Sequence, residues 1–134
     1  MFDLSNLNTT DSGDTGAKLH LRHPGTDELL YADDAETKPV EIKLCGSDSK
    51  RFRKINAQLV RRMQGKKKQT NDDVENGVTE QLVGVTLGWQ NLIMNGQEQV
   101  FDQETATNIY NEYRWIREQV AAFVADRSNF LPTA

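Results

Sequence analysis

The chain has 134 residues and one cysteine, with 37% hydrophobic residues, 27% charged residues and a formal net charge of -4. This length fits one domain, and a single cysteine excludes an internal disulfide and the usual Cys/His zinc motifs. The acidic balance argues against nucleic-acid binding as the main function, because attraction to phosphates needs a basic surface.

The first 16 residues are rich in Asn, Thr, Ser, Asp and Gly. Such a segment buries too little apolar surface to offset the entropy lost on ordering, so residues 1–16 are predicted to form a flexible arm. Phe2, Leu4 and Leu7 leave two hypotheses open: a frayed terminus, or a short segment that docks on a neighbour. The arm lacks the features of a signal peptide, and no later stretch is long and apolar enough for a membrane span, which predicts a cytoplasmic protein.

The segment after the arm is predicted to form strands. Apolar and polar residues alternate over 17–23, which is the period of a half-buried strand. Pro-Gly-Thr-Asp at 24–27 favours a turn, and residues 29–31 return as a second strand. A third alternation covers residues 40–45. The sequence therefore predicts an N-terminal antiparallel meander of three strands.

Two helices are predicted in the middle of the chain. The first follows a Ser-Asp cap and repeats apolar residues at spacings of three and four: Phe52, Ile55, Leu59 and Met63. This stripe is expected to cover one face of the sheet. Residues 65–77 have the composition of a loop and predict a hinge, with Val74 as an alternative start for the next helix. The second helix repeats Val78, Leu82, Val85 and Trp89, and Gly88 is expected to mark its end.

A tight hairpin and two further helices are predicted near the end of the chain. Asn95-Gly96 is a dipeptide that tolerates the positive φ angles of a hairpin turn. Asp102 is suited to cap a short helix that ends at Tyr113. A last helix is expected to begin near Trp115 and to stop at residues 128–129.

The order of these elements predicts the fold class. We expect an α+β fold, in which the N-terminal three-stranded meander is followed by a helical C-terminal half with a small hairpin. Residues 17–134 are predicted to form a single domain. Within it, residues 17–69 make a lobe of strands and a helix, and residues 70–134 make a mainly helical lobe.

The sequence has few residues in the patterns that catalysis, metal binding or phosphate binding requires. His20 and His23 lie in the first predicted hairpin, and Cys45 lies in a strand that could bring it near them. A Cys45–His20 pair therefore stands as an alternative to a surface histidine and an inert thiol. The pairs Asp33-Asp34 and Asp72-Asp73 lack the spacing of a calcium loop, and no phosphate-binding loop is present. We expect a non-enzymatic protein with no catalytic residue, cofactor or metal.

The second half of the chain carries a recurring set of motifs. They are Gly-Val-Thr-Leu-Gly-Trp at 84–89, Asn95-Gly96, Phe101 and Glu104, Tyr-Asn-Glu-Tyr at 110–113, Trp-Ile-Arg-Glu-Gln-Val at 115–120, and the run from Phe123 to Phe130 that ends in Asn-Phe. This pattern resembles the tail assembly chaperones of long-tailed phages, over less than half of the chain. The resemblance implies a phage protein in the host cell cytoplasm that keeps the tape measure protein soluble and helps tail tube subunits polymerise around it. Some relatives also exist as a longer frameshifted form.

Protein-binding residues are predicted on this basis, because a chaperone needs exposed apolar or aromatic grooves flanked by charge. Basic residues from Lys50 to Lys68 are read either as a solvated helix face or as a binding face. Aromatic residues at the C-terminus are read either as core or as a peptide-docking surface. The candidates are Val78, Leu82, Val85, Trp89, Tyr110, Tyr113, Trp115, Arg51, Lys54 and Arg61.

These residues are expected to bind the tape measure protein, with the tail tube protein and a second copy of the chain as further partners. One alternative is a structural virion protein, either a minor tail protein or a head–tail connector, whose arm threads onto a neighbour. Another is a small DNA-associated regulator, which would depend on the basic stretch.

Overall fold

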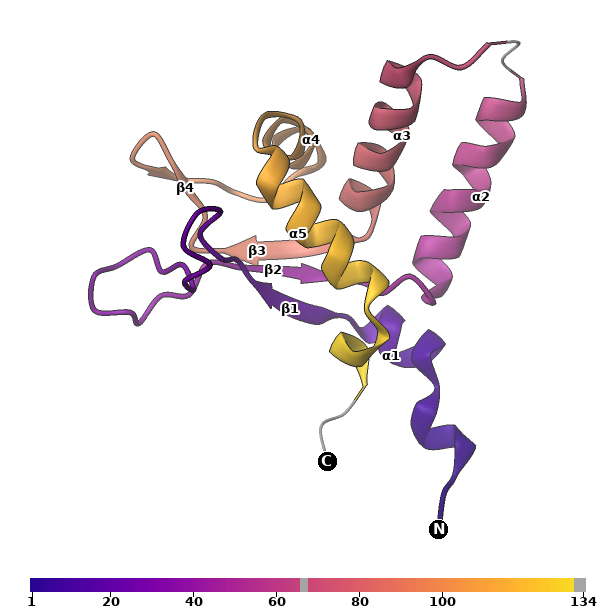
Figure 1. Ribbon diagram of the computed structural model, residues 1–134, viewed down its shortest axis with the longest axis horizontal. Helices are drawn as coiled ribbons and strands as arrows, with labels where there is room; N and C mark the ends of the chain where they lie inside the picture. The colour runs from indigo at the N-terminus through magenta and orange to yellow at the C-terminus, as the bar shows by residue number, and fades with distance from the viewer. Residues whose placement is uncertain (66–67, 132–134) are drawn as a thin grey trace.

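The computed structural model describes residues 1–65 and 68–131, and groups of helices alternate with groups of strands along the chain (Figure 1). In chain order they are the 3-10 helix η1 (Leu4–Leu7), α1 (Thr9–Thr15), β1 (Ala17–His20), β2 (Glu41–Leu44), α2 (Lys50–Gln64), α3 (Asn71–Gly84), β3 (Thr86–Gln90), β4 (Ile93–Met94), β5 (Gln97–Glu98), α4 (Gln103–Glu112), α5 (Arg114–Ala125) and the 3-10 helix η2 (Arg127–Phe130). The predicted α+β class is confirmed.

The sheet consists of three antiparallel strands in the order β1-β2-β3. Leu19 lies opposite Ile42, and Ile42 lies opposite Trp89. The central strand alternates as expected, because Ile42 and Leu44 are buried while Lys43 between them is exposed. In Figure 1, α5 crosses in front of this sheet, and its Val120 is fully buried in the core.

The third strand of the sheet does not come from residues 29–31, as the sequence predicted. That segment makes only isolated bridges, Arg22 with Leu29 and Tyr31 with Pro39. The neighbour of β2 is instead β3, from a stretch predicted to be helical. The apolar spacing fits a helix as far as Gly84, where the helix ends. The Thr86 hydroxyl then donates to the Leu82 carbonyl at 2.8 Å, which satisfies one of the free carbonyls at the helix end.

The α2–α3 hairpin extends away from the sheet (Figure 1), so α2 does not cover a sheet face as predicted. No residue of α2 is buried, and its Ile55 side chain packs against Gly84 at the base of α3. The predicted loop over residues 65–77 is also too long, since α3 already begins at Asn71. The cause is a capping box: the Thr70 side chain accepts from the Asp73 N–H, and the Asp73 carboxylate accepts from the Thr70 N–H.

The hairpin and the last two helices agree with the sequence, except that α5 ends at Ala125, before the predicted stop at residues 128–129. Asn95 and Gly96 have φ of 54° and 77° between β4 and β5, as the tight turn requires. The Asp102 side chain accepts from the Thr105 N–H and caps α4. Tyr113 separates α4 from α5 with φ of -104° and ψ of 80°, outside the helical region.

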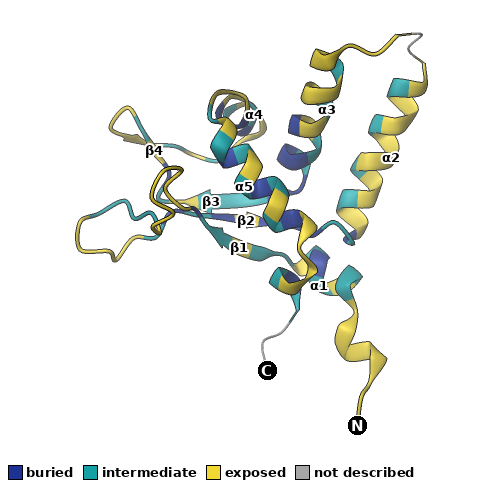
Figure 2. Ribbon diagram, viewed as in Figure 1, coloured by how far each residue is buried: buried dark blue, intermediate teal, exposed yellow. Residues whose placement is uncertain are grey.

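Residues 9–16, which the sequence assigns to a flexible arm, form α1 and its C-terminal Gly16 and pack against the rest of the molecule. Gly13 is buried against Ser49, and the Asp14 carboxylate accepts from the N–H groups of Lys50 and Arg51. A carboxylate is stabilised there because the free N–H groups and the dipole of a helix favour negative charge at its start. By contrast, residues 1–8 are exposed (Figure 2).

The same end of the molecule holds an ion pair between Asp48 and Arg127 at 2.6 Å. The Arg127 guanidinium and the Thr9 hydroxyl lower the pKa of Asp48 from 3.8 to about 2. The pair therefore stabilises the fold above about pH 4, and this contribution is lost as the pH falls from about 4 to about 2. Because the Arg127 side chain is 70% exposed, solvent screening reduces the contribution to about 1 kcal/mol.

We expect Asp48→Asn to lower the free energy of unfolding by about 1 kcal/mol at neutral pH and to have little effect near pH 2. Urea titrations at a series of pH values measure this difference. Asp34→Asn, at an exposed loop residue, is the control. A difference between Asp48→Asn and the wild type that stays constant across the series would contradict the pKa assignment.

Candidate protein-binding site

The ten predicted binding residues do not form one surface. Leu82, Val85 and Tyr110 are in the core, with exposed fractions of 3%, 0% and 0%. The Tyr110 hydroxyl lies 2.7 Å from the Thr86 hydroxyl, and burial raises the pKa of Tyr110 to about 12. These three residues hold the fold together and are not available to a partner.

Trp89 also has a structural role. Its indole Nε1–H donates to the Gln99 carbonyl at 2.8 Å, and its ring packs edge-on against Phe101 at a centroid distance of 4.9 Å. Both contacts attach the segment that carries the β4–β5 hairpin to the sheet. Trp89 is therefore a support for the neighbouring surface rather than a contact point.

Tyr113 and Trp115 line an apolar cleft of about 370 Å³, which we call the aromatic cleft. Its walls come from the chain around residues 21–40, the β3–β4 connection, β4, α4 and α5. The lining residues are Leu21, Leu30, Tyr31, Ala32, Val40, Asn91, Leu92, Ile93, Met94, Ile109, Tyr113, Trp115 and Ile116. Of the predicted candidates, the structure brings only these two aromatic residues together here.

Local backbone geometry builds this cleft. Asn91 has φ of 61°, a value that asparagine tolerates better than most residues, and it turns the chain out of β3. Its side-chain amide donates to the Pro39 carbonyl at 2.8 Å, which joins two walls of the cleft. On the opposite side, the break at Tyr113 lets α4 and α5 both contribute to the lining.

The chemistry of the aromatic cleft is that of an apolar receptor. Asn91 is the one amide among the lining residues, and none of them is a carboxylate, lysine, arginine or histidine. Tyr31 packs edge-on against His20, whose Nε2 lies 2.7 Å from the Leu30 carbonyl. This lining suits large apolar side chains of a partner.

Several cleft residues were not predicted from the sequence. Leu30, Tyr31 and Met94 lie in irregular segments or a two-residue strand, without the periodic pattern that identifies a functional face. Asn91 brings together parts of the chain that are 52 positions apart. No local signal in the sequence indicates that contact.

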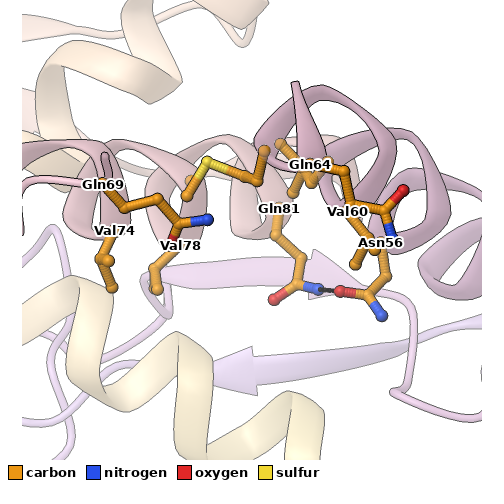
Figure 3. A pocket seen from close by; sticks show the side chains of 10 residues that line it. Asn56, Val60, Gln64, Gln69, Val74, Val78 and Gln81 are labelled. Atoms are coloured by element: carbon orange, nitrogen blue, oxygen red, sulfur yellow. Dashed lines mark hydrogen bonds between the residues drawn. The ribbon is translucent and has the colours of Figure 1, made fainter. Parts of the chain in front are cut away.

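Val78 lies in a second apolar site, between α2 and α3, which we call the hairpin groove (Figure 3). The groove has a volume of about 420 Å³. An amide–amide hydrogen bond of 3.0 Å joins Gln81 to Asn56 within its lining. Val60 on α2 and Val74 on α3 also line it, and all three valines are exposed.

The three basic candidates on α2 have different surroundings. Arg51 donates through Nε to the Gly84 carbonyl at 2.6 Å, so it caps the C-terminal end of α3. Lys54 and Arg61 are exposed to solvent. Arg61 contacts the carbonyl of Ala57 in its own helix at 3.4 Å. Arg51 is therefore structural, whereas Lys54 and Arg61 remain accessible.

The alternative Cys45–His20 pair is wrong. His20 lies opposite Glu41 at one end of β2, whereas Cys45 follows Leu44 at the other end. Cys45 is buried, and this burial raises the pKa of its thiol. Within residues 1–65 and 68–131, no group of three or more His, Cys, Asp or Glu residues is placed to hold a metal ion.

Comparisons with known proteins do not assign the chain to a family. No protein-family model matches it, and neither the curated proteins nor the solved structures gave a match. Among the described residues, no helix has both the length and the apolar character that crossing a membrane requires. The fold and its two apolar sites therefore carry the functional argument.

Proposed function

We propose that this chain is a non-catalytic phage tail assembly chaperone that binds the tape measure protein in the host cytoplasm and assists assembly of the tail tube. The observation that carries the proposal is the aromatic cleft, a receptor lined by Tyr113 and Trp115 with no charged side chain. The sequence resemblance over residues 78–131 supports it, because both aromatic residues belong to the motifs that carry this resemblance.

The aromatic cleft suits one kind of partner segment in particular. An amphipathic helix presents apolar side chains at positions i, i+3 and i+4, and a cleft of about 370 Å³ has room for one or two of them. A long helical protein that awaits assembly exposes many such segments. Binding them in turn would keep that protein soluble without any chemical reaction.

Trp115→Ala is expected to weaken binding of the tape measure protein about tenfold, because a large aromatic contact at an interface is worth at least 1.4 kcal/mol. Ile93→Asp, at a cleft residue that is 51% exposed, should weaken it similarly without disturbing the core. Co-purification from cells that express both proteins, followed by titration calorimetry, measures the effect.

The control for these variants is Val100→Ala, since Val100 is 80% exposed and lies outside the cleft. Circular dichroism checks that every variant is folded. Unchanged binding by folded Trp115→Ala and Ile93→Asp proteins would show that the aromatic cleft is not the binding site.

Mass spectrometry of purified phage particles separates the chaperone from the alternative structural role. A chaperone is absent from particles, whereas a minor tail or connector protein is present at a fixed, symmetry-related copy number. The exposed Phe2 and Leu4 favour the structural role as second candidate, because they are available to dock on a neighbouring subunit.

A further inference from the structure

The distal part of the α2–α3 hairpin has an apolar face that no described part of the chain covers. Val60, Val74 and Val78 are 47%, 50% and 42% exposed, and they line one continuous groove (Figure 3). The hairpin also extends away from the sheet (Figure 1), and it meets the C-terminal helices through α3, whose Thr79 hydroxyl donates to the Asn111 side chain of α4. Isolated exposed valines are ordinary on a protein surface, but three around one groove mark a surface that association would bury.

The two helices of the hairpin carry opposite charge. Between Lys50 and Gln64, α2 has six lysine and arginine residues and no carboxylate: Lys50, Arg51, Arg53, Lys54, Arg61 and Arg62. Between Asn71 and Gly84, α3 has four carboxylates and no basic residue: Asp72, Asp73, Glu75 and Glu80. Part of this charge is matched inside the molecule, since Arg62 pairs with Glu80 and Glu75 pairs with Arg114. The Asp73 carboxylate also accepts from the Thr70 N–H.

We propose that the hairpin groove is the interface of a two-fold dimer of this chain, in which α2 of each copy lies against α3 of the other. A partner for the groove needs apolar residues, an acidic helix to lie against α2 and a basic helix to lie against α3. A second hairpin has this composition. The dimer goes beyond the proposed function and does not depend on it.

The charges also select the direction of the two-fold axis. Two hairpins that meet face to face can be related by an axis parallel to their helices or by an axis that crosses them. The crossing axis places α2 on α2 and α3 on α3, so that like charges meet. The parallel axis places each basic helix on an acidic one and produces a four-helix arrangement with both hairpin tips at the same end.

Sedimentation equilibrium of the full chain over a range of concentrations tests this proposal. We expect a monomer–dimer equilibrium whose dissociation constant rises with added salt, because salt screens attraction between exposed charges. Val78→Lys should weaken the dimer at least about tenfold, since the new charge meets the basic α2 of the partner copy. Val78→Asp should weaken it less, because a carboxylate there meets cations.

Val100→Lys is the control, since Val100 is 80% exposed and lies outside the hairpin. It should leave the dissociation constant unchanged, and circular dichroism should show all three variants folded. A chain that stays monomeric at every soluble concentration would overturn the proposal. So would a dimer that neither Val78 variant weakens, or one that Val78→Asp weakens more than Val78→Lys.

Discussion

Tyr110→Ala is expected to lower the free energy of unfolding by about 3–5 kcal/mol, the range for removing a buried aromatic ring. The Tyr110 side chain is fully buried and belongs to the same apolar cluster as Val85 and Val120. Truncation would leave a cavity among α4, α5 and the sheet. Urea or thermal unfolding followed by circular dichroism measures the loss.

Tyr110→Phe is the matched control, because it keeps the ring and removes only the hydroxyl. The Thr86 hydroxyl donates its proton to the Leu82 carbonyl, so the Tyr110 hydroxyl donates to Thr86. Loss of that donor leaves no buried N–H or O–H group without an acceptor, and a cost of about 1 kcal/mol is expected. Equal effects of Tyr110→Ala and Tyr110→Phe would mean that the hydrogen bond, not the packing, stabilises this part of the core.

The sequence allowed the helices to be predicted better than the strands, for a physical reason. Helix starts are local, and a cap residue such as Asp102 satisfies an N–H group only three positions away. The predicted start of α2 was also close, although its cap is Ser49 and not the predicted Ser47-Asp48. A strand needs a partner that can lie anywhere in the chain. Ile42 pairs with Trp89, and no local pattern near Trp89 distinguishes that strand from a further turn of helix.

The candidate site shows the same limit. Tyr113 and Trp115 could be identified because aromatic residues near a helix start stand out in the sequence. Their companions in the cleft, such as Tyr31 and Met94, come from irregular segments that tertiary contacts position. The apolar spacing of Leu82 and Val85 could not show whether they face the core or a partner, since both fates require the same residue type.

Gly16→Ala is expected to lower the free energy of unfolding by about 2–4 kcal/mol, although it adds one methyl group. Gly16 joins α1 to β1 with φ of 87° and ψ of 166°, a region almost restricted to glycine. A Cβ there would lie 3.0 Å from the Leu44 carbonyl oxygen and 2.9 Å from a methyl of Leu87. The carbonyl belongs to the central strand and cannot move without disturbing the sheet.

Gly88→Ala is the control for this substitution, because a Cβ at Gly88 would meet no atom within 4 Å and its φ is not positive. It should be neutral or should stabilise the protein by up to about 1 kcal/mol, since glycine weakens a strand. Chemical unfolding of both variants beside the wild type makes the comparison. If Gly16→Ala proved as harmless as Gly88→Ala, residues 9–16 would not be held against the rest of the molecule, and the flexible arm expected from composition would be the better description.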